Sequence, residues 1–99
     1  MAETKAAFIV HGFVQGKGYR YFVKGIAEKL GVKGIVKNQD DGSVLIIAEA
    51  EEGTLTEMER QINVSIKYGI EVMNIEMYYE GEAGFPKIDT DFDDFKILK

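Results

Sequence analysis

The first third of the chain pairs a short apolar run with an amphipathic segment. The run AAFIVH at positions 6–11 predicts a β-strand, and the glycine-rich residues 12–19 predict a loop. From Arg20 to Leu30 apolar side chains return every three or four residues, which predicts a helix that Gly31 ends. Gly25 lies inside this helix at a cost of about 1 kcal/mol relative to alanine, so we expect a close packing contact there. The predicted buried face carries Phe22, Val23, Ile26, Ala27 and Leu30.

Two further strands and a tight turn follow the first helix. Residues 32–38 place Val32, Gly34 and Val36 on one face, which predicts a second strand. The segment QDDGS contains Asp-Gly, a pair that readily accepts positive φ angles, and predicts the turn of a hairpin. The run VLIIAEA at positions 44–50 then predicts a third strand that pairs back on the second.

The second half repeats the order of a helix followed by a strand. Thr54 and Glu57 have the spacing of a capping box, so we expect a second helix to begin at Thr54 and to end at Gly69. Residues 70–79 predict a fourth strand, residues 80–91 a loop, and FDDFKILK at the end a short last strand. The predicted buried face of this helix consists of Leu55, Met58, Ile62 and Ile66.

The order β-α-β-β-α-β predicts an α+β fold of the ferredoxin-like kind, an antiparallel sheet with both helices on one face. In such a fold the first and second strands run parallel and are joined by a helix that runs back. The end of the first strand, the start of the first helix and the end of the second strand then share one edge. The sequence therefore predicts that residues 12–20 meet Asn38 at that edge.

Composition and charge narrow the possible functions. The chain has 99 residues, enough for a single domain over 1–99, and it contains no cysteine, which fits a reducing, cytoplasmic location. We find neither a leader sequence nor an apolar run of the ~20 residues that a membrane span needs. The net charge of −5, with scattered lysines, argues against nucleic acid as a partner.

The glycine-rich stretch HGFVQGKGYR at positions 11–20 is the candidate anion-binding segment. Such a loop can turn several backbone N–H groups toward one anion, and a helix start adds further free N–H groups. Arg20 adds a planar fork of donors suited to phosphate or carboxylate, and Asn38 is an amide able to hold a water molecule. The residues alone leave two interpretations open: a phosphate cradle, or an ordinary loop with a surface arginine and an asparagine that closes a turn.

Two linked motifs carry a resemblance to a known family. The stretch VHGFVQGKGYR, followed eighteen residues later by Asn38 in GIVKNQDDGSV, resembles the acylphosphatase family. That family shows Gly-x-Val-Gln-Gly-Val-x-Phe-Arg at the first motif and Gly-aromatic-Val-Lys-Asn, then Gly-x-Val, at the second. The likeness is close over residues 8–50, and beyond them it extends to the order of elements and to Phe95-x-Ile97.

The resemblance implies a ferredoxin-like, monomeric enzyme that hydrolyses small acyl phosphates to a carboxylate and inorganic phosphate, without metal or cofactor. Arg20 would grip the phosphoryl oxygens, and Asn38 would position the attacking water. Backbone N–H groups of the loop would complete the phosphate-binding set. That set consists of Gln15, Gly16, Lys17, Gly18, Tyr19 and Arg20.

Departures from the family pattern keep an alternative open. Lys17 replaces the usual valine, Tyr19 a phenylalanine and Ile35 an aromatic residue, and Ala50 stands where glycine is common. Lys17 places a long cation in the glycine-rich loop over residues 12–19, which we call the cradle loop, and this allows altered activity. The alternative is a non-catalytic module of the same family that binds a phosphorylated ligand or protein partner. The sequence does not decide whether the acidic loop over 80–94 covers the site.

Overall fold

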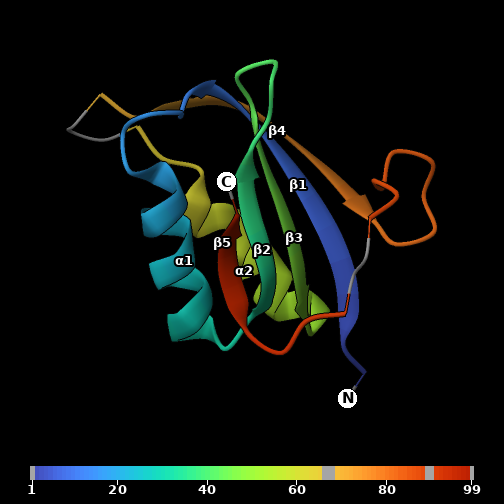
Figure 1. Cartoon of the computed structure of the whole chain (residues 1–99). Helices are drawn as coiled ribbons and strands as arrows, with labels where there is room; N and C mark the ends of the chain where they lie inside the picture. The colour runs from blue at the N-terminus through green and yellow to red at the C-terminus, as the bar shows by residue number, and fades with distance from the viewer. Residues whose placement is uncertain (1, 66–68, 89–90, 99) are drawn as a thin grey trace.

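In the part of the chain that the structure describes, residues 2–65, 69–88 and 91–98, two helices cover one face of a five-stranded β-sheet (Figure 1). This computed structural model confirms the predicted ferredoxin-like order and the predicted short last strand near the C-terminal end. The elements are β1 (Thr4–Phe13), α1 (Tyr19–Leu30), β2 (Lys33–Asn38), β3 (Val44–Ala50), α2 (Glu52–Ile62), β4 (Glu71–Tyr79) and β5 (Phe95–Leu98).

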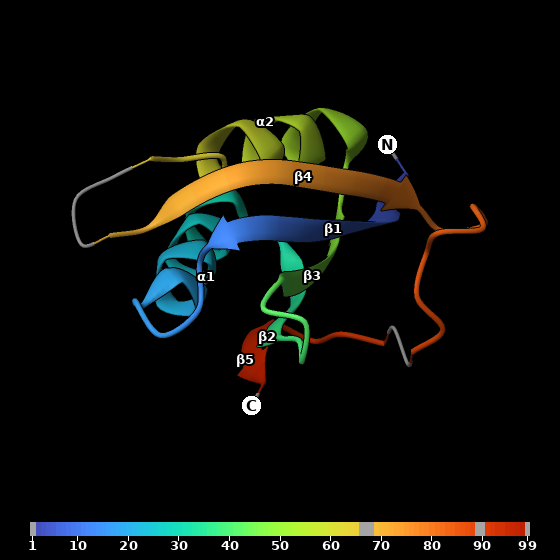
Figure 2. The ribbon, with the colours of Figure 1, turned by 90° about the horizontal axis from the view of Figure 1, so that it is seen from above.

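The strands lie in the order β4-β1-β3-β2-β5, and the sheet is mixed rather than wholly antiparallel. β4, β1, β3 and β2 pair antiparallel, whereas β5 runs parallel to β2, with Gly34 beside Phe95 and Lys37 beside Leu98. The described parts of the connection between β4 and β5 lie on the helix-free side of the sheet, as Figure 2 shows. This route brings the chain to β2 at its starting end, so the last strand enters in the same direction as β2.

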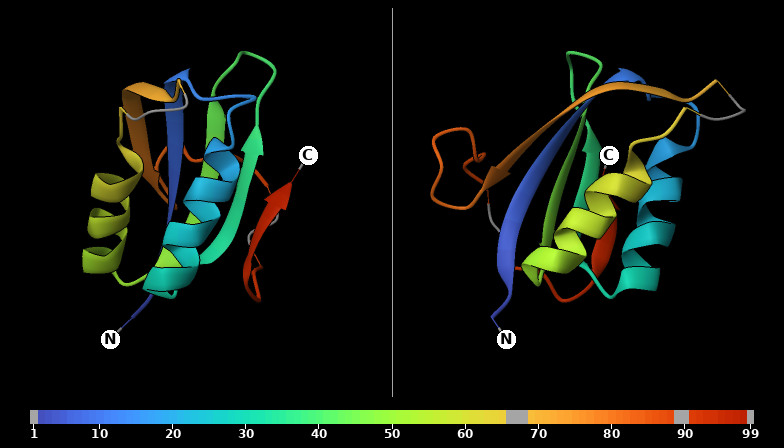
Figure 3. Two further views of the ribbon diagram at one scale, coloured as in Figure 1. Left: turned by 90° about the vertical axis from the view of Figure 1, so that its left-hand side faces the viewer. Right: turned by 180° about the vertical axis from the view of Figure 1, so that it is seen from behind.

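Apolar side chains form a layer on each face of the sheet. On the helix side, side chains such as Phe8, Val10 and Ile46 pack beneath α1 and α2, which lie together on one face (Figure 3). On the other face, Phe85 and Phe92 from the β4–β5 connection cover a smaller cluster formed by Ala7, Ile35, Leu45 and Ile47. Among the described residues, no helix has the length and apolar character needed to cross a membrane.

Strand register brings the predicted site segments to one edge of the sheet. β1 and β2 both pair antiparallel with β3, and Val44 of β3 lies beside Val10 on one side and Asn38 on the other. The ends of β1 and β2 therefore lie level, close to the start of α1. This edge, at the top of Figure 1, also carries the β2–β3 hairpin turn. The edge predicted from the sequence is confirmed.

The predicted start of the second helix is wrong. α2 begins at Glu52 with Glu51 as its N-cap, and no side chain caps its first N–H groups. Thr54 lies inside the helix, and the Glu57 carboxylate accepts hydrogen bonds from Arg60 and Gln61 instead of reaching back. The helix ends at Ile62, before the expected Gly69, and Ile66 lies outside the described residues.

The close contact expected at Gly25 is also absent from the described structure. Gly25 is exposed on α1, and a methyl group added there would meet no atom within 4 Å among the described residues. By contrast, Gly31 ends α1 as predicted, in the left-handed conformation with φ of 73°. Gly25 therefore has no packing role that the described contacts explain.

Candidate active site

The loop between β1 and α1 leaves backbone donors open. Gly16 and Gly18 have φ angles of 74° and 83°, which side chains with a Cβ rarely adopt. Gly18 is also the N-cap of α1, and no side chain caps the helix. The N–H groups of residues 15–20 make no hydrogen bond with another described residue. A cluster of free N–H groups at a helix start is a favourable environment for an anion.

Gln15 fixes this loop to the β2–β3 hairpin. Its Nε2 donates to the carbonyl oxygens of Gln39 at 2.7 Å and Ser43 at 2.8 Å. The side chain of Gln15 thus has a structural partner on each side of the hairpin turn. This bond pair holds the cradle loop beside the segment that directly follows Asn38.

The hairpin turn is itself stabilised by polar side chains. The carboxylate of Asp41 accepts hydrogen bonds from the backbone N–H and the hydroxyl of Ser43, while Gln39 Nε2 donates to Ser43 Oγ at 2.9 Å. The bonds from Ser43 hold the pKa of Asp41 below its usual range. The turn that supports Gln15 is therefore well determined at neutral pH, where Asp41 is ionised.

Arg20 lies in the first turn of α1 and reaches the last strand. Its Nη1 donates to the carbonyl oxygen of Leu98 at 2.9 Å. Leu98 pairs with Lys37, the residue before Asn38, so the Arg20 guanidinium is held next to the end of β2. One nitrogen is engaged by this bond, and the remaining N–H groups of the fork have no partner among the described residues.

Asn38 carries the clearest sign of a missing partner. Its Oδ1 is buried and has no hydrogen-bond partner among the described residues. Alternation along β2 places Asn38 on the same face as Val36, which packs into the core beneath the helices. A buried acceptor without a partner costs about 1–3 kcal/mol, so this atom is suited to a bound water or ligand.

Tyr19 was expected to contribute only its backbone N–H group to phosphate binding. Its side chain also makes a hydrogen bond to α2. Its ring is buried, and its hydroxyl donates to the carbonyl oxygen of Ile62, the last residue of α2, at 2.8 Å. Burial raises the pKa of Tyr19, so the phenol stays protonated. The hydroxyl links the end of the cradle loop to the end of α2.

The Lys17 side chain lies against Gly69, just before β4. The residue is exposed, and a methyl group at Gly69 would lie 3.4 Å from its Nζ. No ion pair between Lys17 and another described residue is present. The side chain therefore lies over Gly69, while the backbone N–H of Lys17 remains in the cradle loop.

The structure thus gathers the backbone of Gln15 to Tyr19, Arg20 and Asn38 at one edge. Sequence reasoning missed the Leu98 carbonyl and the Tyr19 hydroxyl, because both bonds join residues more than forty positions apart and no local pattern signals them.

The β4–β5 connection places Phe85 and Phe92 on the helix-free face, whereas Asn38 belongs to the helix-bearing face. Among the described residues, no three carboxylate or histidine side chains are grouped to hold a metal ion.

Comparison with known proteins identifies the family. The family model named acylphosphatase matches residues 6–97. The chain belongs to the acylphosphatase family. An acylphosphatase of Pasteurella multocida (strain Pm70) is 40% identical over 88 residues, which cover 89% of this chain and 93% of that protein. An acylphosphatase of Listeria welshimeri serovar 6b is 44% identical over 78 residues, covering 79% of this chain and 84% of that protein.

Structural comparison agrees with the family assignment. The crystal structure of acylphosphatase from Bacillus subtilis superposes with a TM-score of 0.81 and 31% identity, covering 97% of this chain and 99% of that chain. Proteins of this name are hydrolases of acyl phosphates. The family resemblance stated from the two sequence motifs is therefore confirmed across nearly the whole chain.

Proposed function

We propose that this chain hydrolyses small acyl phosphates at the sheet edge that carries the cradle loop, Arg20 and Asn38. The observation that carries the proposal is the buried, unpartnered Oδ1 of Asn38. It lies level with the ends of β1 and β2, at the edge where the loop leaves its N–H groups free. An anion and a water molecule together would satisfy these groups.

The proposed roles follow from what each group can donate or accept. The phosphoryl oxygens accept hydrogen bonds from the backbone of residues 15–19 and from the Arg20 fork. Asn38 Oδ1 accepts a hydrogen bond from the attacking water and so fixes its orientation. The water oxygen bonds to phosphorus while the bond from phosphorus to the carboxylate oxygen breaks, which releases a carboxylate and inorganic phosphate.

The chemistry suits a site with few side chains. A carboxylate is a good leaving group, so positioning of the water and stabilisation of phosphoryl charge supply most of the rate enhancement. Free N–H groups at the start of α1 add a partial positive charge near the transferred group. The proposal therefore assigns no residue as a general base.

The alternative is a non-catalytic module that binds a phosphorylated ligand. Its motivation is Lys17, which stands where the family pattern has valine. The Lys17 side chain, however, lies over Gly69, and a loop backbone can bind phosphate whatever the side chain. Curated relatives that match over most of the chain are named acylphosphatase, which favours hydrolysis.

Hydrolysis of benzoyl phosphate in the presence of EDTA tests the proposal against the alternative. We expect enzymatic release of inorganic phosphate that EDTA leaves unchanged and that added phosphate inhibits competitively. Competitive phosphate binding without turnover would instead support the non-catalytic module.

We also propose that the protein works as a single domain over 1–99, as a monomer, in the cytoplasm and without nucleic acid. The absence of cysteine and the net charge of −5 support the last two points. Elution as a single species of monomer size, independent of concentration, tests the oligomeric state.

A further inference from the structure

The outer edge of β4 offers unpaired backbone groups. The N–H of Glu80 donates to the carbonyl of Lys5 on β1 at 3.0 Å, whereas the N–H of Tyr79 donates outward, to the Glu82 carboxylate. Because successive residues of a strand alternate in direction, Ile75 and Met77 point their N–H and C=O groups outward as well. These groups have no hydrogen-bond partner among the described residues.

The free stretch of this edge is bounded at both ends. At its start, the N–H of Val72 donates to the carbonyl of Val64 at 2.9 Å, so the segment after α2 already covers the first residues of β4. At its far end, the Glu82 carboxylate accepts a hydrogen bond from the Tyr79 N–H. Between these ends the edge is long enough for a short strand to pair with Ile75 and Met77.

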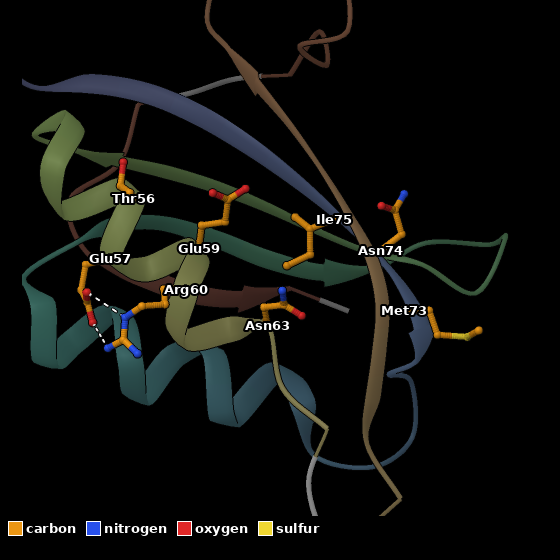
Figure 4. A pocket seen from close by; sticks show the side chains of 8 residues that line it. All are labelled: Thr56, Glu57, Glu59, Arg60, Asn63, Met73, Asn74 and Ile75. Carbon is orange, nitrogen blue, oxygen red and sulfur yellow. Dashed lines mark hydrogen bonds and ion pairs between the residues drawn. The ribbon is translucent and has the colours of Figure 1, made fainter.

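A hollow lies beside this edge, between β4 and α2. It has a volume of about 510 Å³, and Glu59, Asn63 and Ile75 are among the residues that line it. In Figure 4, Ile75 points from β4 toward α2, while Glu59 lies on α2 and Asn63 directly after its end, at the same hollow. Arg60 turns away from β4 to pair with Glu57 (Figure 4). The hollow thus offers an apolar wall from β4 and a carboxylate from α2.

The surroundings of the edge are acidic. Burial raises the pKa of Tyr79, and the charges of Glu52, Glu59 and Glu82 raise it further, which places all three carboxylates near this ring. The ion pairs of Lys24, Arg60 and Lys96 are made with other carboxylates, namely Glu28, Glu57 and Asp94. A second copy of this chain would bring the same carboxylates against each other, so like charges oppose self-pairing.

We propose that the outer edge of β4 binds an extended, lysine- or arginine-rich peptide segment of another protein as an added strand. The backbone of Ile75 and Met77 pairs with the peptide, and alternate peptide side chains face the hollow. There the stem of a lysine or arginine packs against Ile75, and its cation meets Glu59. This surface is separate from the edge that carries Arg20 and Asn38.

Titration with a short peptide that alternates lysine and valine tests the proposal, with amide NMR shifts as the readout. We expect the amide signals of Ile75 and Met77 to move on binding. Glu59→Gln should weaken binding about fivefold at low salt, the effect of one partly screened charge pair. The matched control Asp93→Asn removes one exposed carboxylate from the β4–β5 connection and should change binding by less than about twofold.

Two further peptides separate strand addition from simple charge attraction. The same lysine peptide, N-methylated at alternate residues, cannot donate to the Ile75 and Met77 carbonyls and should bind at least about tenfold more weakly. A peptide with glutamate in place of lysine should not bind. Equal binding of the N-methylated peptide, equal effects of Glu59→Gln and Asp93→Asn, no binding of the lysine peptide, or self-association through Ile75 and Met77 would each overturn the proposal.

Discussion

Replacement of Gln15 by methionine removes the bond pair that joins the cradle loop to the hairpin while keeping a side chain of similar size. The two lost hydrogen bonds, of 2.7 and 2.8 Å, end on carbonyls of Gln39 and Ser43. Each carbonyl keeps one partner, because the Gly42 N–H donates to Gln39 and the Gln39 N–H donates to Ser43. No buried acceptor is left bare, so we expect a loss of about 1–2 kcal/mol in the free energy of unfolding.

Denaturant unfolding of Gln15→Met measures this loss, and an unchanged m value would show that the native state stays equally compact. Gln61→Met is the matched control, because within the described part of the chain the Gln61 amide bonds only to Glu57, one turn away on the same helix, at 2.6 Å. We expect that control to lose no more than about 0.5 kcal/mol. Equal losses in the two variants, or no loss in Gln15→Met, would refute the structural role of Gln15.

Three further predictions concern local features of the fold. Tyr19→Phe removes the hydroxyl bonded to the last carbonyl of α2 and should lower the free energy of unfolding by about 1–2 kcal/mol; an unchanged value would contradict the buried bond. Gly25→Ala should raise the melting temperature, because alanine gains about 0.5–1 kcal/mol in an open helix position; destabilisation would show a contact outside the described residues. Hydrogen bonds from Tyr78 and His11 lower the pKa of Glu76. The stability that these bonds supply should therefore be lost as the pH falls from the ordinary glutamate pKa of about 4.3 through the lower folded pKa. Glu76→Gln should reduce the slope of stability against pH in acid unfolding, and an unchanged slope would count against these bonds.

Local patterns in the sequence were sufficient to predict most of the fold. The repeat of Phe22, Ile26 and Leu30, with Val23 and Ala27 beside it, predicted α1. In the structure Val23, Ile26 and Ala27 are buried, while Phe22 and Leu30 are half-buried. Asp-Gly predicted the hairpin turn that the structure contains at Gly42. Once the order of elements was known, the geometry of parallel strands placed Asn38 at the edge of the glycine-rich loop. No contact between distant residues had to be guessed for this step.

Features set by distant partners were not predictable in the same way. The capping-box spacing of Thr54 and Glu57 is a local preference, yet the helix begins earlier and the Glu57 side chain pairs with Arg60 instead. The bond from Arg20 to Leu98 spans 78 residues and depends on the parallel entry of β5, which hydrophobic spacing does not encode. Side-chain partners of the site therefore required the three-dimensional arrangement.

We expect Asn38 to orient the attacking water without being needed to hold the phosphate. Asn38→Ala, assayed with benzoyl phosphate, should lower kcat by a factor of ~10² or more, while the competitive inhibition constant of inorganic phosphate changes by less than about twofold. Asn74→Ala, which truncates an exposed asparagine on β4, is the control and should leave both values unchanged. An equal loss of phosphate binding in Asn38→Ala, or an unchanged kcat, would show that Asn38 does not have this role.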